Sequence, residues 1–230
     1  MNLCLHCRRR LATCVCSELR PFRTQTRFII LMHPMEYKKE KVGTGRFSHL
    51  ILENSQIIVG IGFDSDPEYL KVLNDENYQS VVLYPGENTV NLSEASATDL
   101  PGKPLQVFVI DGTWACAKKM MKLTTSLHDL PRVSFTTDRI SEFKVKHQPI
   151  AGCLSTAESL HQVLLELNRM GREATLGQEE NLMDVFRKTV EQQLAAAADL
   201  ERTRYRAKPF IEPHLRKISK KWQKRNVFFT

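Results

Sequence analysis

The chain has 230 residues, of which 42% are hydrophobic and 26% charged, so it is long enough for one ordinary α/β domain with small appendages. No run approaches 18 apolar residues, and no apolar stretch follows the basic residues of 1–10, which argues against a membrane-spanning helix and a secretory signal. We therefore expect a cytoplasmic protein whose cysteines bind metal or pack as thiols rather than form disulfides.

The net charge of +7 is unevenly distributed. Residues 1–27 carry six arginines and one acidic residue, residues 202–230 carry ten basic residues and one acidic residue, and residues 28–201 hold 17 basic and 24 acidic residues. Basic ends on an acidic body predict local contact with a polyanion such as RNA. For the C-terminal run, a solvated tail explains the composition equally well.

The first predicted element is a metal-binding segment. The pattern C-x2-C-x6-C-x-C joins four cysteines, Cys4, Cys7, Cys14 and Cys16. Four thiolates form a closed tetrahedral zinc site, which folds a short segment that has no core of its own and leaves the metal a structural role. His6 is a weaker alternative ligand, and four ordinary thiols are the alternative interpretation. Arg8, Arg9 and Arg10 lie on the intervening loop, where we expect them to contact an RNA backbone.

From residue 27 onward, short apolar runs alternate with helical segments. We predict strands at residues 28–32, 56–60, 80–84 and 105–110, with a weaker one at 131–135. Uniformly apolar strands are typical of a parallel sheet covered on both faces. We predict helices at residues 45–53, 67–75, 114–127, 156–170 and 179–205. The pattern indicates a doubly wound α/β sheet with a helical C-terminal part, in which ligands bind beyond the carboxyl ends of the strands.

Polar motifs follow the first and third of these strands. His33-Pro-Met-Glu36 and Gly43-Thr-Gly-Arg46 come after residue 32, and Arg46 at a helix start is suited to holding a carboxylate or phosphate. Tyr84-Pro85-Gly86 follows the third strand. Taken alone, both motifs are explained as turns, the second as a type II turn with positive φ at Gly86.

The motif after the fourth strand is the most informative. Asp111-Gly112 turns the chain, and Thr113 is placed to cap a helix that begins at Trp114. Asp111 is expected at the strand tip as a base or as an acceptor for an amine. The helix amides are suited to an anion, and Trp114 to walling the pocket. A capped helix with a core tryptophan explains the same residues without any ligand.

The last motif is Leu154-Ser155-Thr156-Ala157-Glu158. Ser155 and Glu158 form a capping box, which accounts for both residues without a function. If this helix start lies beside the Asp111 loop, it is also placed to bind a ligand. Cys116 and Cys153 are expected to be packing residues.

Together, these motifs resemble the DTW-domain family of aminocarboxypropyltransferases that act on tRNA uridine. The signature is Asp111-Gly-Thr-Trp114, with Tyr84-Pro-Gly86 before it and Leu154-Ser-Thr-Ala-Glu158 after it. His33-Pro-x-Glu36 with Thr44-Gly-Arg46 and the cysteine segment also match in order. The resemblance runs from about residue 4 to residue 170 and does not include the basic tail.

The resemblance implies a SPOUT-like, mostly parallel sheet with a trefoil-knotted cofactor site. It also implies S-adenosylmethionine as donor, transfer of its 3-amino-3-carboxypropyl group to N3 of a tRNA uridine, and release of 5′-methylthioadenosine. On this basis the expected donor-binding residues are Arg46, Tyr84, Pro85, Gly86, Asp111, Gly112, Thr113, Trp114, Leu154, Ser155 and Thr156.

Uracil N3 is protonated at neutral pH, so the reaction needs a base, for which we predict Asp111 first and Glu158 second. The chain is then divided into a zinc-binding knuckle (1–26), a donor-binding catalytic domain (27–205) and a basic tail (206–230). The oligomeric state stays open between a dimer and a monomer, with the monomer favoured. The alternatives are a knotted RNA methyltransferase, an aminocarboxypropyltransferase acting on ribosomal RNA, and a non-catalytic zinc module that binds RNA.

Overall fold

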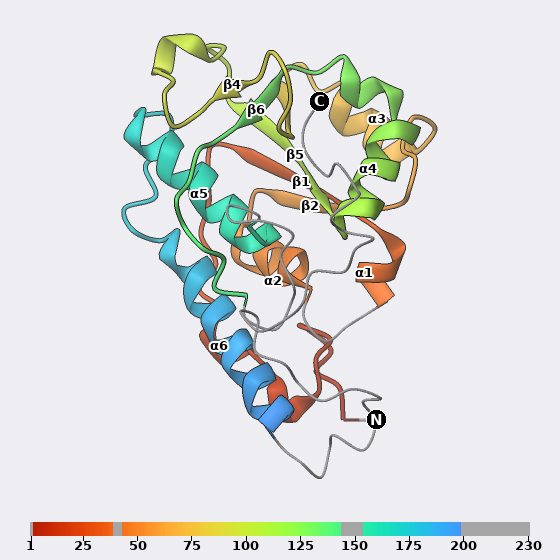
Figure 1. Ribbon diagram of the computed structural model, residues 1–230, viewed down its shortest axis with the longest axis vertical. Coiled ribbons are helices and arrows are strands. Elements are labelled where there is room, and N and C mark those ends of the chain that lie inside the picture. The colour runs from red at the N-terminus through yellow and green to blue at the C-terminus, as the bar shows by residue number, and fades with distance from the viewer. Residues whose placement is uncertain (1, 39–42, 144–153, 199–230) are drawn as a thin grey trace, which may run out of the picture.

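The computed structural model describes residues 2–38, 43–143 and 154–198. Within these ranges, a sheet of six parallel strands has the order β2-β1-β5-β3-β6-β4 (Figure 1). The strands are β1 (Arg27–Met32), β2 (Ser55–Val59), β3 (Gln79–Leu83), β4 (Val90–Asn91), β5 (Leu105–Asp111) and β6 (Arg132–Ser134). The predicted parallel sheet and its five predicted strands are confirmed. The sequence did not indicate β4, because two residues are too few to show a period.

The helices also follow the prediction closely. They are α1 (Pro34–Lys38), α2 (Thr44–Ile51), α3 (Pro67–Leu73), α4 (Trp114–Leu123), α5 (Thr156–Arg169) and α6 (Glu180–Ala198). The predicted helix 114–127 is wrong in its last part. Thr124 leaves the helix, accepts a hydrogen bond from the backbone N–H of Phe63, and begins a separate 3₁₀ turn, Thr125–His128. α1 replaces a segment predicted as a polar loop, and the end of the predicted helix 179–205 lies outside the described residues.

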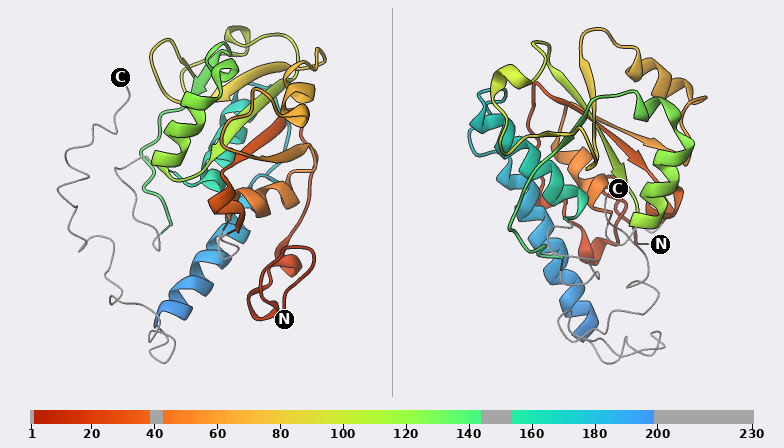
Figure 2. Two further views of the ribbon diagram at one scale, coloured as in Figure 1. Left: turned by 90° about the vertical axis from the view of Figure 1, so that its right-hand side faces the viewer. Right: turned by 45° about the horizontal axis from the view of Figure 1, so that its top comes forward.

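Helices cover both faces of the sheet. α3 and α4 pack on one face, and α2, α5 and α6 pack on the other (Figure 2). The central strand β5 serves both layers, since Phe108 packs with the α3 and α4 side whereas Val107 and Val109 pack with the α2, α5 and α6 side. This two-sided burial explains why the strand is apolar at successive positions.

The strand register gathers the polar loops at one edge. Met32, the last residue of β1, lies opposite both Asp111 and Val59. The backbone N–H of His33 donates to the carbonyl of Asp111 over 2.9 Å, so the chain segments after β1 and β5 leave the sheet together. Because all strands are parallel, the loop after β3 emerges at the same edge.

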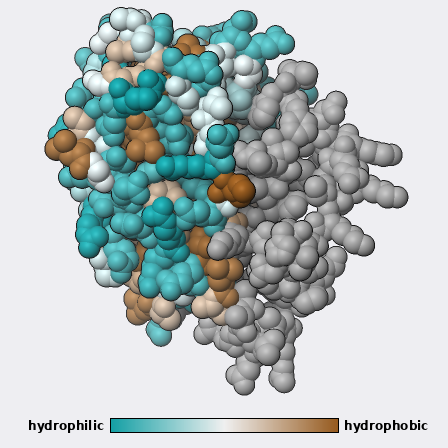
Figure 3. All heavy atoms as spheres, turned by 60° about the vertical axis from the view of Figure 1, so that its left-hand side comes forward, coloured by the Kyte–Doolittle hydropathy of each residue, from teal (hydrophilic) through white to brown (hydrophobic). Residues whose placement is uncertain are grey.

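Several predictions lie beyond the described part of the chain. The described residues do not show the predicted trefoil knot, and residues 144–153, which include Cys153, fall outside them, as does the basic tail 206–230. The three-part division of the chain also stays a prediction. No helix in the described ranges is both long and apolar enough to cross a membrane, and the face in Figure 3 is mostly hydrophilic with scattered hydrophobic residues.

The cysteine segment is attached to α6. Two nitrogens of the Arg9 guanidinium donate to Thr189 Oγ1 over 2.8 Å and to Gln192 Oε1 over 3.0 Å. In the left view of Figure 2 this segment lies below the sheet, on the side to which α6 also extends. Arg9 therefore links residues close to the N-terminus with the last described helix.

We expect Arg9→Ala to lower the free energy of unfolding by about 1–3 kcal/mol, because two charge-assisted hydrogen bonds are lost from a half-buried site. Chemical denaturation measures this change, and hydrogen exchange should become faster in α6. The matched control is Arg10→Ala, since Arg10 is exposed. Equal stability of the two variants would contradict the proposed attachment.

Candidate functional site

Asp111 lies at the centre of the gathered loops. It ends β5, the residue is 7% exposed, and its Oδ1 accepts a hydrogen bond of 2.7 Å from Thr156 Oγ1. Thr156 is the first residue of α5, so this bond joins the tip of the central strand to a helix start 45 residues away. The predicted strand-tip position of Asp111 is confirmed, and the structure shows that the helix start at Thr156 lies beside it.

Gly45 of α2 packs against the same carboxyl group. A Cβ added at Gly45 would lie 2.5 Å from Asp111 Oδ2 and 3.1 Å from Met32 Cε. No other side chain fits at this position without moving the carboxyl group. The early Gly-Thr-Gly motif is therefore more than a turn: its second glycine makes room for Asp111.

The two predicted helix caps are present. Thr113 Oγ1 accepts from the backbone N–H of Cys116, and Ser155 and Glu158 form the capping box of α5. Glu158 is buried, and its carboxylate also accepts hydrogen bonds from Ser141 Oγ and the Glu142 N–H, each over 2.8 Å. These contacts fasten the 141–142 segment to α5, so the structure gives Glu158 a positioning part, and its predicted role as second base stays a prediction.

The loop after β3 differs from its predicted turn type. A type II turn needs positive φ at Gly86, but the positive φ in this loop is at Asn88, with φ of 55°. The absence of a side chain at Gly86 instead leaves space for Arg132, whose Nη1 would lie 2.6 Å from a Cβ at that position. Tyr84 begins the same loop. Burial raises the pKa of its phenol, and the charge of Arg132 partly opposes that rise.

The sequence suggested that Arg46 holds an anion, but in the structure its guanidinium contacts Tyr37. Its Nη2 donates to the carbonyl of Tyr37 over 2.9 Å, and its guanidinium lies 4.7 Å from the centre of the Tyr37 ring. Arg8 of the cysteine segment donates to the hydroxyl of the same tyrosine over 2.9 Å. Tyr37 thus connects the cysteine segment with α2.

Two further predicted residues, Gly112 and Trp114, follow Asp111 closely in the chain. Trp114 is half-buried at the start of α4. Gly112 is closely packed, since a Cβ there would lie 3.2 Å from Cys116 Cβ and 3.4 Å from His33 Cβ. No sequence motif indicates the contacts of Gly45 with Asp111 or of Arg132 with Gly86, because short-range patterns carry no signal for packing between distant segments.

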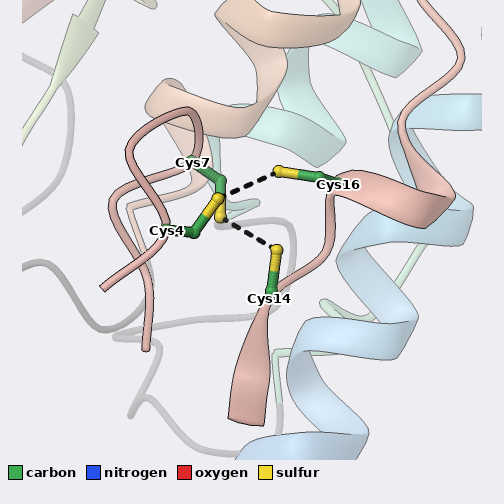
Figure 4. A group of neighbouring side chains, drawn as sticks. All are labelled: Cys4, Cys7, Cys14 and Cys16. Atoms are coloured by element: carbon green, nitrogen blue, oxygen red, sulfur yellow. Dashed lines mark hydrogen bonds between the residues drawn. The ribbon is translucent and has the colours of Figure 1, made fainter. Parts of the chain in front are cut away.

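The four N-terminal cysteines form one cluster (Figure 4). Their sulfurs all lie within 4.8 Å of one another, with Cys4 and Cys16 sulfurs 3.5 Å apart and Cys7 and Cys14 sulfurs 3.7 Å apart. Tetrahedral zinc with Zn–S bonds of about 2.3 Å places neighbouring sulfurs about 3.8 Å apart. The arrangement therefore fits a zinc site with four thiolate ligands, in which sulfur atoms occupy all four coordination positions.

The thiols cannot all ionise easily without a cation. Backbone N–H groups of Cys7 and His6 lower the pKa of Cys4 to about 6, whereas burial and neighbouring thiols raise the pKa of Cys16. A divalent metal stabilises all four thiolates at once. Arg9 supplies a nearby positive charge, since Cys7 and Cys14 oppose the lowering of its pKa by burial.

Fold and site define a class of protein: a parallel α/β domain with a polar site at the carboxyl ends of its strands and a four-thiol cluster attached to it. The DTW domain matches residues 1–194, a range that includes both features. The chain belongs to the DTW-domain family.

Three relatives share the same printed name, "tRNA-uridine aminocarboxypropyltransferase 2". The Drosophila melanogaster protein is 31% identical over 173 residues, covering 72% of this chain and 66% of the relative. The Mus musculus protein is 32% identical over 182 residues, and the Macaca fascicularis protein 29% over 180 residues, each covering 75% of this chain and 59% of the relative. The matches thus span about three fifths to two thirds of these relatives. No solved structure matches the chain significantly.

Gly45→Ala should destabilise the protein by about 1–3 kcal/mol, because the added methyl group collides with the Asp111 carboxyl group. The collision outweighs the gain of about 1 kcal/mol that alanine brings to a helix. Gly102→Ala is the control, since a Cβ there would meet no atom within 4 Å. Urea denaturation compares the two variants, and a Gly45→Ala protein as stable as Gly102→Ala would refute the close approach.

Elemental analysis of the purified protein should find about one zinc per chain. Serine at both Cys4 and Cys7 should release it, whereas Cys116→Ser, outside the cluster, should retain it. A metal-free wild-type protein would show that the cluster is not a zinc site.

Proposed function

We propose that this protein transfers the 3-amino-3-carboxypropyl group of S-adenosylmethionine to N3 of a uridine in tRNA and releases 5′-methylthioadenosine. The observation that carries the proposal is the buried carboxyl group of Asp111, held by Thr156 where the loops of the parallel sheet meet. Membership of the DTW-domain family and the printed name of the three relatives support it.

The donor site is formed by the loops after β3 and β5 and by the start of α5. Backbone amides at the starts of α4 and α5 are suited to hydrogen-bonding the donor, and Trp114 walls the site. A sulfonium carries three carbons, so the protein selects the reacting carbon by what it places in line with the nucleophile. The proposed donor-binding residues are Tyr84, Pro85, Gly86, Asp111, Gly112, Thr113, Trp114, Leu154, Ser155 and Thr156. Arg46, which contacts Tyr37, is a further candidate.

Asp111 acts as the general base. Its carboxylate accepts the N3 proton of uracil while N3 forms a bond to the γ-carbon of the methionyl group. The bond between that carbon and sulfur breaks, and its electron pair neutralises the sulfonium and gives methylthioadenosine. Thr156 fixes the orientation of the carboxylate through the 2.7 Å hydrogen bond. Glu158 is the second candidate, although three donors already occupy its oxygens.

The zinc site is structural in this proposal. Four sulfur ligands leave no open position at which the metal activates water or binds substrate. The segment serves tRNA binding through its exposed Arg10, together with the basic tail. Arg8 and Arg9 are engaged within the molecule, by Tyr37 and by α6 respectively, which reduces the predicted contact of three arginines to one.

Product analysis separates this reaction from methyl transfer. An aminocarboxypropyltransferase yields methylthioadenosine, whereas a methyltransferase yields S-adenosylhomocysteine. Mass spectrometry of the nucleosides then shows whether tRNA or ribosomal RNA carries the added group. A non-catalytic RNA-binding module predicts neither product.

Asp111→Asn should slow the transfer about 100- to 10,000-fold, because the amide keeps the shape and the hydrogen bond from Thr156 but cannot accept the proton. Methylthioadenosine release is measured with unmodified tRNA and S-adenosylmethionine. The control Asp129→Asn changes an exposed residue and should leave the rate unchanged. Wild-type turnover by the Asp111→Asn enzyme would exclude Asp111 as the base.

A further inference from the structure

Arg132 lies beside the loop after β3, although no sequence motif includes it. It begins β6, is paired with Val82 of β3, and is half-buried. β6 lies between β3 and β4, so the segment from Tyr84 to Thr89, which joins those two strands, passes across β6. The backbone N–H of Tyr84 donates to the carbonyl of Val133 over 3.1 Å, which holds this loop against β6.

The guanidinium of Arg132 rests on the loop backbone at Gly86. A Cβ at Gly86 would lie 2.6 Å from Nη1 but 3.8 Å or more from the other nearby atoms of Arg132. Thr89 Oγ1 donates to the carbonyl of Gly86 over 2.7 Å and fixes the loop from its other side. The loop is therefore shaped to leave room for one end of the guanidinium.

This cation has no anion opposite it in the described part of the chain. Several other arginines have carboxylate or carbonyl acceptors: Arg27 pairs with Asp75, Arg169 with Glu166, and Arg172 with backbone carbonyls. Arg132 makes no hydrogen bond or ion pair with a described residue, and its charge is felt instead by the Tyr84 phenol. A guanidinium that has no carboxylate partner among the described residues keeps its donors available to a ligand oxyanion.

The other arginine near the site is already occupied. Arg46 donates to the carbonyl of Tyr37 and lies over its ring, so binding a ligand through its guanidinium would require it to give up these contacts. Only one strand, β3, separates β6 from β5, which ends at Asp111. The register places Arg132 level with Phe108, so its side chain leaves the sheet on the α3 and α4 side and extends to Gly86 beyond the end of β3. Asp111 faces the α2 and α5 side, so an extended ligand that meets both groups passes across the strand ends.

We propose that Arg132 binds the carboxylate of the donor's aminocarboxypropyl group, a role for which the sequence alone suggested Arg46. This inference rests on the proposed function and deepens it. A planar guanidinium binds a carboxylate through two parallel hydrogen bonds. Holding the end of the longest arm of the sulfonium keeps its γ-carbon, rather than its methyl group, toward the uracil.

The test uses two ligands that differ in this arm. S-Adenosylhomocysteine retains the amino and carboxylate groups, whereas 5′-methylthioadenosine lacks them. Calorimetry with the full-length Arg132→Gln protein should show S-adenosylhomocysteine binding weakened about 10- to 100-fold and methylthioadenosine binding changed less than about twofold. Gly86→Ala, which displaces the guanidinium but retains its charge, should weaken S-adenosylhomocysteine selectively in the same way. The matched control is Arg46→Gln, which should weaken S-adenosylhomocysteine less than Arg132→Gln does.

The other outcomes would overturn the inference. Equal losses for both ligands would mean that Arg132 supports the pocket as a whole. A selective loss in Arg46→Gln alone would assign the carboxylate to Arg46. Unchanged S-adenosylhomocysteine affinity together with weaker tRNA binding would assign Arg132 to an RNA phosphate. If the wild-type protein binds neither ligand, the proposed function itself fails. If the wild-type protein binds both ligands and Arg132→Gln changes neither affinity, only the inference about Arg132 fails.

Discussion

The hydrogen bond between Thr156 and Asp111 is the constraint on which the site depends. It joins the end of the central strand to the start of α5, and Gly45 of α2 closes over the same carboxyl group. Burying a carboxyl group in a sheet edge is unfavourable unless nearby groups satisfy it. The packing of three distant segments therefore determines where the carboxyl group points, and with it the geometry available to any ligand.

Much of the fold could be predicted because local sequence patterns determine it. Uniformly apolar runs such as 105–110 report burial on both faces, and the helix caps at Thr113 and Ser155 report where α4 and α5 begin. α4 ends earlier than predicted because the Thr124 side chain accepts a hydrogen bond from the backbone N–H of Phe63, 61 residues earlier. A contact of that kind has no local signature, and neither does a strand as short as β4.

The site shows the same division between local and distant information. The capping motifs and the strand-tip position of Asp111 were read from adjacent residues. The environments of Arg46 and Gly86 were not, because each depends on a partner from another segment: Tyr37 for the arginine and Arg132 for the glycine. A positive φ was expected from the Pro-Gly pair, yet the structure places it two residues later, at Asn88.

Tyr37 contacts both the cysteine segment and α2. Its hydroxyl accepts from Arg8 of the cysteine segment, and its ring and carbonyl meet Arg46 of α2. Equilibria that share a structural element are thermodynamically linked, and the linkage is reciprocal. A change in the position of the Tyr37 ring therefore acts on both partners at once, so the packing of the cysteine segment and the packing of α2 are linked through one side chain.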